Sequence, residues 1–140
     1  LQVLLEAERP APELRVLGHG PRLEQVLVNL LQNAIDAVAG RAEARVCLRL
    51  VESGERVAIE VADTGPGIPA EVCGQVFDAF FTTKADGLGL GLAISRGIVE
   101  DCGGNLILAG GDGAGTVFRM ELIRAADAVP SVGKPVGATP

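Results

Sequence analysis

Asn29 and Asn33 lie one helical turn apart in a segment whose apolar residues recur every three or four positions. Gln25 and Asp36 fall on the same side, so four polar side chains share one stripe of the expected helix. Asparagine amide oxygens suit a hard cation such as Mg²⁺, which prefers oxygen ligands and keeps several waters while it bridges to phosphates. A solvated polar face is the other interpretation of two asparagines taken alone.

Asp63 precedes a turn with the sequence Thr64-Gly65-Pro66-Gly67. It shares the parity of Val57, Ile59 and Val61, so its carboxylate should point toward the buried side of a strand, where it needs hydrogen-bond donors. The exocyclic amino group of adenine is such a donor, and guanine has an acceptor at the equivalent position, so this contact would select ATP over GTP. Alternatively, Asp63 only caps the turn.

Three glycines, Gly87, Gly89 and Gly91, stand just ahead of a second helical pattern. Backbone amides and the helix dipole favour an anion there, and missing side chains let a phosphate approach. The segment matches neither a P-loop nor a dinucleotide fingerprint, which leaves a glycine-hinged lid over a triphosphate or simple flexibility. Lys84 is the only lysine before the C-terminal tail, and it either reaches the γ-phosphate or is a solvated loop residue.

Two helices and four strands are expected to position these groups. The helices cover about residues 22–39, between Pro21 and Gly40, and about residues 90–102, before two glycines. The strands cover residues 44–51, 56–63, 105–109 and 116–123, with turns at 52–55 and 110–115. Their irregular alternation favours an α/β fold, a two-layer α/β sandwich in which helices cover one face of a mixed sheet.

The composition restricts the function classes. The chain has 140 residues, 48% of them hydrophobic, and a net charge of -6 without a Lys/Arg cluster, so nucleic acid is an unlikely ligand. Three scattered cysteines indicate neither a disulfide framework nor a metal site and fit a reducing cytosol. Neither a membrane-spanning run nor a signal peptide is apparent. The start at Leu1 suggests a segment of a longer protein, with a folded domain at 1–124 and a Pro/Gly-containing flexible tail at 125–140.

The quoted residues resemble the GHKL superfamily of Bergerat-fold ATPases, and within it the catalytic and ATP-binding domain of a bacterial two-component sensor histidine kinase. The resemblance covers about residues 14–122 and implies a mixed, mostly antiparallel sheet with helices on one face. The amino-acid sequence of the matching motifs is similar to that of kinases of the nitrogen-regulation and C4-dicarboxylate-sensor type. Five motifs carry it in order: the N box at 23–37, the G1 box at 63–68, the F box at 76–84, the G2 box at 87–92 and a last glycine motif at 113–118.

The resemblance implies a role for each matching position. Asn33 would bind Mg²⁺, Asn29 would lie near the metal and phosphates, and Asp63 would hold the adenine amino group. The base pocket would be shaped by Gly65 and Gly67, with Thr116 nearby, and the phosphates would contact Lys84 and the loop from Gly87 to Gly91. The other residues expected at the nucleotide are Asp36, Ile68, Phe80, Thr82, Thr83, Leu88, Gly89, Leu90 and Leu92.

Asn29 and Lys84 are the residues expected to serve catalysis. Hydrolysing members of the superfamily carry glutamate where Asn29 stands, and a carboxylate can activate water whereas an amide cannot take a proton. Asn29 therefore favours a phosphoryl-transfer function over that of an ATPase clamp. A third possibility is a nucleotide-sensing module without turnover.

The acceptor histidine of the resembled kinases is missing from this chain. The only histidine, His19, precedes the first helix, lacks the acidic residue that normally follows an acceptor, and is expected to be structural or exposed. The resemblance implies that the partner is a histidine-bearing dimerisation domain of the same protein, which in turn serves a response regulator. The segment would be a cytoplasmic domain without direct membrane contact, and its parent could be an inner-membrane sensor.

Overall fold

The computed structural model describes residues 2–7, 14–82, 89–110 and 115–125. Along the chain these form β1 (Gln2–Ala7), α1 (Gly20–Val38), β2 (Arg45–Ser53), β3 (Arg56–Asp63), the 3₁₀ helix η1 (Ala70–Gln75), α2 (Gly91–Asp101), β4 (Asn105–Gly110) and β5 (Thr116–Ile123). The five strands make one sheet in the order β1-β2-β3-β5-β4. β1 runs parallel to β2, and the other neighbours are antiparallel.

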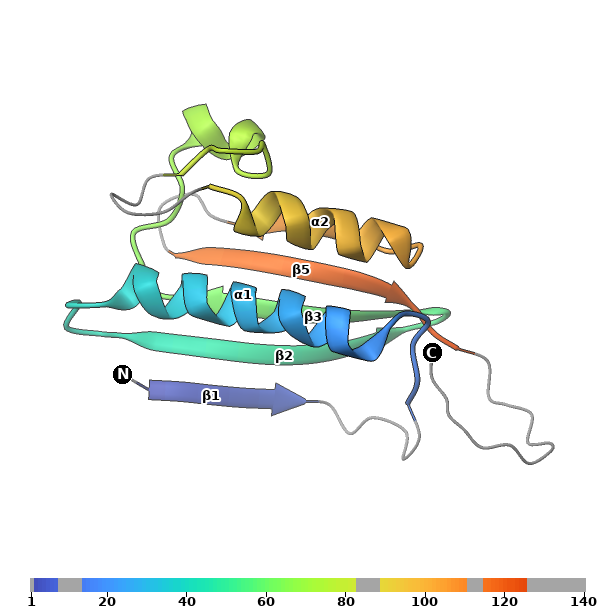
Figure 1. Cartoon of the computed structure of the whole chain (residues 1–140). Coiled ribbons are helices and arrows are strands. Elements are labelled where there is room, and N and C mark those ends of the chain that lie inside the picture. The colour runs from blue at the N-terminus through green and yellow to red at the C-terminus, as the bar shows by residue number, and fades with distance from the viewer. Residues whose placement is uncertain (1, 8–13, 83–88, 111–114, 126–140) are drawn as a thin grey trace, which may run out of the picture.

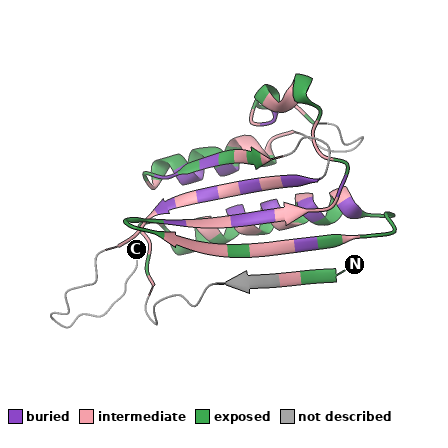
Figure 2. Cartoon of the chain, turned by 180° about the vertical axis from the view of Figure 1, so that it is seen from behind, coloured by how far each residue is buried: buried purple, intermediate pink, exposed green. Residues whose placement is uncertain are grey.

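Both α-helices lie on the same face of the sheet, and within the described part of the chain no helix covers the opposite face (Figures 1 and 2). The predicted two-layer sandwich with a mixed, mostly antiparallel sheet is therefore confirmed. The predicted strand 56–63 matches β3, and 116–123 matches β5. The strand expected at 44–51 is longer than predicted, because β2 continues to Ser53 and leaves only Gly54 and Glu55 in the turn, with Gly54 at φ 62°.

Two elements were not predicted. β1 pairs with β2 across more than forty residues and carries no clear alternation, so no local pattern revealed it. The 3₁₀ helix η1 lies in a stretch for which no helix or strand was predicted. Within the described residues, neither helix is both long enough and apolar enough to cross a bilayer.

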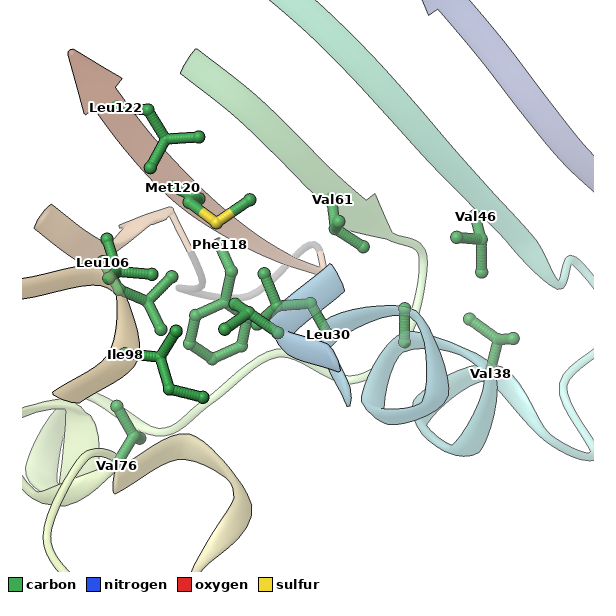
Figure 3. Close-up of a cluster of buried hydrophobic side chains, with 13 residues drawn as sticks. Leu30, Val38, Val46, Val61, Val76, Ile98, Leu106, Phe118, Met120 and Leu122 are labelled. Carbon is green, nitrogen blue, oxygen red and sulfur yellow. The ribbon is translucent and has the colours of Figure 1, made fainter. Parts of the chain in front are cut away.

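Alternating apolar residues of the sheet and the apolar stripes of both helices form the core between the two layers. On α1 the buried residues are Val26, Leu30, Ala34 and Val38, which recur every four positions as the 3.6-residue period requires. Figure 3 shows sheet and helix side chains meeting in this core, among them Val46, Val61, Phe118, Met120, Leu122, Leu30, Val38 and Ile98. This packing fixes which side of α1 faces away from the sheet and places its polar stripe on the flank.

Glu60 is a buried acid on the face of the sheet that carries no helix, with 6% of its surface exposed. Its cross-strand neighbours are Arg49 on β2 and Arg119 on β5. Arg49 Nη1 donates to Glu60 Oε1 at 3.0 Å, and Arg119 Nε donates to Oε2 at 2.8 Å. Burial alone would raise the pKa of the Glu60 carboxyl, but the two arginines lower it below its ordinary value. The three side chains therefore stabilise the central strands as an ion-paired row.

Glu60→Gln should lower the free energy of unfolding at pH 7 by about 1 to 3 kcal/mol, because two arginines lose a charged partner on a partly buried surface. The folded-state pKa lies below the unfolded value of 4.5, so this stabilisation is present above pH 4.5 and is lost as the pH falls through the folded pKa. Chemical denaturation across this pH range should show the difference between variant and wild type shrinking toward low pH.

Glu121→Gln is the matched control, because Glu121 lies on the same face and its contact with Arg119 is long, at 3.8 Å. Its effect should stay within about 0.5 kcal/mol. Equal losses in the two variants, or no loss in Glu60→Gln at pH 7, would contradict the assigned role of Glu60.

Candidate functional site

Asp63 ends β3 with its carboxylate on the helix-covered side, as the strand parity predicted. The backbone amide of Gly65 donates to Asp63 Oδ1 at 2.8 Å. Burial raises the pKa of this carboxyl, and hydrogen bonds from the Gly65 and Thr116 amides together with the charge of Arg41 lower it only in part. Asp63 is therefore a half-buried acceptor whose charge is incompletely compensated by the protein.

Thr116 lies directly opposite Asp63 in the ladder between β3 and β5 and is 5% exposed. It shares the inward face with Phe118, Met120 and Leu122, all of which are buried. The strand register therefore places Thr116 beside Asp63.

Two glycines let the chain close tightly around Asp63. A Cβ on Gly65 would lie 2.8 Å from the carbonyl oxygen of Ala37 and 2.9 Å from its Cβ, so the turn packs directly against the end of α1. A Cβ on Gly115 would lie 2.0 Å from the carbonyl oxygen of Asp63, and Gly115 has φ 102°. The family resemblance predicts Gly65 at the base pocket and assigns no separate role to Gly115, which belongs to the last glycine motif. Its steric contact with Asp63 depends on the strand register, which no local signal reveals.

The remaining residues of this turn have separate structural parts. Gly67 has φ 81°, a left-handed conformation that glycine adopts without strain. Ile68 packs against the core cluster, and its carbonyl oxygen accepts from Cys73 Sγ at 3.6 Å. Thr64 faces the α1–β2 connection, where its hydroxyl donates to the Glu43 carbonyl at 2.7 Å and accepts from the Arg45 amide at 2.9 Å.

Asn29 projects from the flank of α1 toward the start of α2. Its Nδ2 donates to Ser95 Oγ at 3.1 Å. A Cβ on Gly91 would lie 2.7 Å from Asn29 Oδ1. Gly91 was predicted from the sequence to admit a phosphate, and the structure adds a second reason for a glycine, since a Cβ there would displace the Asn29 amide from its observed position.

The other residues of the polar stripe lie on the same flank. Asn33 is partly buried and Asp36 is exposed, and Asp36 Oδ1 accepts from Gln32 Nε2 at 3.0 Å. Asn29, Asn33 and Asp36 therefore occupy one side of the buried row of α1, as predicted.

Phe80 and Gly89 join the two ends of the glycine-containing segment. The Phe80 amide donates to the Gly89 carbonyl oxygen at 2.7 Å, and a Cβ on Gly89 would lie 2.4 Å from the Phe80 carbonyl carbon. Both residues are left-handed, Phe80 at φ 71° and Gly89 at φ 76°, and the Phe80 side chain is 74% exposed. Thr83, Lys84, Gly87 and Leu88 lie outside the described residues, whereas Thr82, Leu90 and Leu92 lie next to that segment or open α2.

An aromatic contact fixes the F-box segment to the rest of the fold. The Phe77 ring meets Phe118 edge to face with centroids 6.0 Å apart, and the Arg96 guanidinium carbon lies 5.0 Å from the Phe77 centroid. Arg96 Nε also donates to Glu100 Oε2 at 3.1 Å along α2. Sequence reasoning missed Ser95 and Arg96, because neither belongs to a motif and each is defined only by its partner across helices.

These groups gather at one end of the sandwich, where β3 ends and both β5 and α2 begin (Figure 1). Together the half-buried Asp63 carboxylate, two asparagine amides and a helix start without a side-chain cap can form hydrogen bonds and bind an anion. His19, at the other end of α1, is exposed and makes no side-chain cap bond, in agreement with its predicted minor role.

Comparison with known proteins identifies the family. The family described as histidine kinase-, DNA gyrase B-, and HSP90-like ATPase matches residues 18–126. The C4-dicarboxylate transport sensor protein DctB of Rhizobium meliloti is 45% identical over 121 residues, which are 86% of this chain and 19% of that protein. The sensor histidine kinase ZraS of Escherichia coli K12 is 40% identical over 122 residues, which are 87% of this chain and 25% of that protein. The chain thus spans a quarter or less of these relatives.

Comparison with solved structures leads to the same family. The catalytic domain of histidine kinase ThkA, in a nucleotide-free form, superposes with a TM-score of 0.76 at 35% identity and covers 88% of this chain and 78% of that one. Full-length ShkA in complex with AMPPNP gives a TM-score of 0.70 at 32% identity, over 89% of this chain and 26% of that one. The chain therefore belongs to the histidine kinase-, DNA gyrase B-, and HSP90-like ATPase family, and its relatives in that family are sensor histidine kinases.

Proposed function

We propose that this chain binds Mg-ATP and donates the γ-phosphoryl group to a histidine on a separate dimerisation domain of the same protein. The observation that carries the proposal is the half-buried Asp63 carboxylate at the inward-facing end of β3, which accepts from the Gly65 amide at 2.8 Å and whose pKa is raised by burial. The exocyclic amino group of adenine would be a further donor to this carboxylate. Thr116, Gly65 and Gly67 border the base, and Ile68 supplies apolar surface beside it.

The phosphates and metal occupy the region between α1 and the start of α2. Asn33 is the proposed Mg²⁺ ligand, because its amide oxygen suits a hard cation that is otherwise held by phosphates and water. The bound ion would neutralise charge on the phosphates. Asn29 and the start of α2 lie beside them, and Lys84, Gly87, Leu88 and Gly89 are proposed as further phosphate contacts. Leu90 and Leu92 flank Gly91 there, and Asp36, Phe80, Thr82 and Thr83 are the remaining proposed contacts.

The chemistry of Asn29 favours transfer over hydrolysis. Its amide nitrogen donates to Ser95, so the side chain is used as a hydrogen-bond donor and offers no base to a water molecule. The nucleophile must then come from outside the chain, as the imidazole nitrogen of the acceptor histidine. That nitrogen forms the new bond to the γ-phosphorus while the bond to the bridging oxygen breaks, and ADP leaves. Asn29 and Lys84 are the proposed catalytic residues, acting by charge and position.

The partners of the parent protein are part of the same proposal. The solved neighbour ThkA forms a complex with response regulator protein TrrA, and this supports a response regulator as the final acceptor, reached through the histidine-bearing domain. The domain occupies residues 1–124 and the tail 125–140, and the domain lies in the cytoplasm, with the parent as a membrane sensor.

Labelled ATP tests the proposed reaction. Incubated with [γ-³²P]ATP and Mg²⁺, the chain alone should remain unlabelled, because it lacks the acceptor histidine. Addition of a separate histidine-bearing dimerisation domain should give acid-labile, base-stable label on that domain, as expected for phosphohistidine. Rapid phosphate release without the partner, or stable label on the chain itself, would overturn the proposal.

Asp63→Asn should abolish most of the stabilisation that Mg-ATP gives the chain and should leave the nucleotide-free fold at least as stable as the wild type. Because the folded pKa of Asp63 is raised, the free domain loses stability as the pH rises from 3.8 through that pKa, and at neutral pH the ionised carboxylate is a cost that the variant removes. Thermal denaturation with and without Mg-ATP measures both effects. Asp101→Asn, at an exposed acid at the end of α2, is the control and should behave like the wild type. An ATP-induced shift of equal size in Asp63→Asn would refute the adenine contact.

A further inference from the structure

The Asn29 side chain is held from two sides by the first turns of α2. Its Nδ2 donates to Ser95 Oγ at 3.1 Å, and its Oδ1 faces Gly91, 2.7 Å from the point where a Cβ would stand. Ser95 and Gly91 are one helical turn apart, so they present a hydroxyl and a gap on the same side of α2. The amide of Asn29 fits into the space between them.

Ser95 is itself unusual in its position. It is 3% exposed and lies among the buried residues of α2, beside Ile98 and Val99. Serine forms helices less readily than alanine, and a buried hydroxyl costs free energy unless it is hydrogen-bonded. Alanine would satisfy the packing and the helix equally well. The hydrogen bond that Asn29 Nδ2 donates to Ser95 Oγ is the interaction that offsets the cost of burying this hydroxyl.

An asparagine amide can turn over about its last side-chain bond, because that torsion has broad, nearly two-fold preferences. At Asn29 the surroundings distinguish the nitrogen of the amide from its oxygen. The nitrogen has an acceptor in Ser95 Oγ. The oxygen lies at the start of α2, where the first-turn amides have no partner within the helix and the helix dipole favours an acceptor atom. Both neighbours therefore favour the same orientation.

We propose that Ser95 is a positioning residue that fixes the orientation of the Asn29 amide, with the oxygen toward the start of α2. This inference rests on the proposed function, since Asn29 matters for transfer only if the phosphates lie beside it. Small errors in the placement of a group at the reacting centre cost large factors in rate. Loss of Ser95 should therefore reduce turnover and leave nucleotide affinity nearly unchanged, because adenine is held elsewhere.

The first test measures autophosphorylation of the full-length kinase that contains this chain. Ser95→Ala should lower kcat about tenfold, equivalent to about 1.4 kcal/mol, with KM for ATP within about twofold of the wild type. In an Asn29→Ala background the same substitution should have no further effect, because the residue acts through Asn29. Gly97→Ala is the control: it adds a methyl to an exposed position of the same helix with no atom within 4 Å, and kcat should not change.

The second test needs no activity. In ¹⁵N NMR spectra of this chain, the two Nδ2 protons of Asn29 should exchange slowly with water in the wild type and several-fold faster in Ser95→Ala. The exchange rate of the Nε2 protons of Gln32 should be the same in both. The two tests separate the proposed function from the role of Ser95. A wild-type kinase that makes no phosphohistidine would overturn the proposed function, but the exchange rate of the Asn29 amide protons would still show whether Ser95 holds that amide. Unchanged exchange, an equal loss of kcat in the Asn29→Ala background, or unfolding of Ser95→Ala would each overturn the assignment of Ser95 as a positioning residue.

Discussion

The incompletely compensated carboxylate of Asp63 is the constraint around which this end of the fold is arranged. Burial raises its pKa, and among the described residues the Gly65 and Thr116 amides and the charge of Arg41 offset that cost in part. A carboxylate so placed is costly to an empty domain and useful to one that binds a donor, which is a common compromise between stability and function. The register of β3 and β5 sets Thr116 opposite Asp63, so the sheet that carries the core also sets the geometry of the acceptor.

Close approach of backbones explains most glycines of the site. Gly65 admits the end of α1, Gly115 admits the carbonyl of Asp63, Gly89 admits Phe80 and Gly91 admits Asn29. At Gly65, Gly89 and Gly115 the nearest atom met is a backbone atom of another segment, so a methyl group there would push that segment away, whereas at Gly91 it would displace the end of the Asn29 side chain. The glycine motifs are therefore explained by close packing around the site as well as by the approach of phosphate groups to the backbone.

Local periodicity was enough to predict α1, α2, β3 and β5 within about two residues, because the 3.6-residue and two-residue patterns are determined by which face is buried. It also placed Asp63 on the inward face. It missed β1, whose partner β2 is distant, and the Arg49–Glu60–Arg119 row, because an acid and two bases on separate strands meet only through register. Ser95 was missed for the same reason, since its only distinguishing feature is a bond across 66 residues. The nucleotide-binding, metal-binding and catalytic roles of all the candidate site residues, Asn29, Asn33, Asp63 and Lys84 among them, stay predictions.

Nucleotide selectivity tests the central claim, that Asp63 accepts a hydrogen bond from the adenine amino group, most directly. Calorimetric titration of the chain with Mg-ATP and Mg-GTP should give an affinity for ATP at least about tenfold higher, because guanine sets an acceptor against the carboxylate and leaves both unpaired. Asp63→Asn should narrow that ratio, since an amide can donate to guanine. Equal affinities in the wild type, or the same ratio in the variant, would contradict the assignment of Asp63.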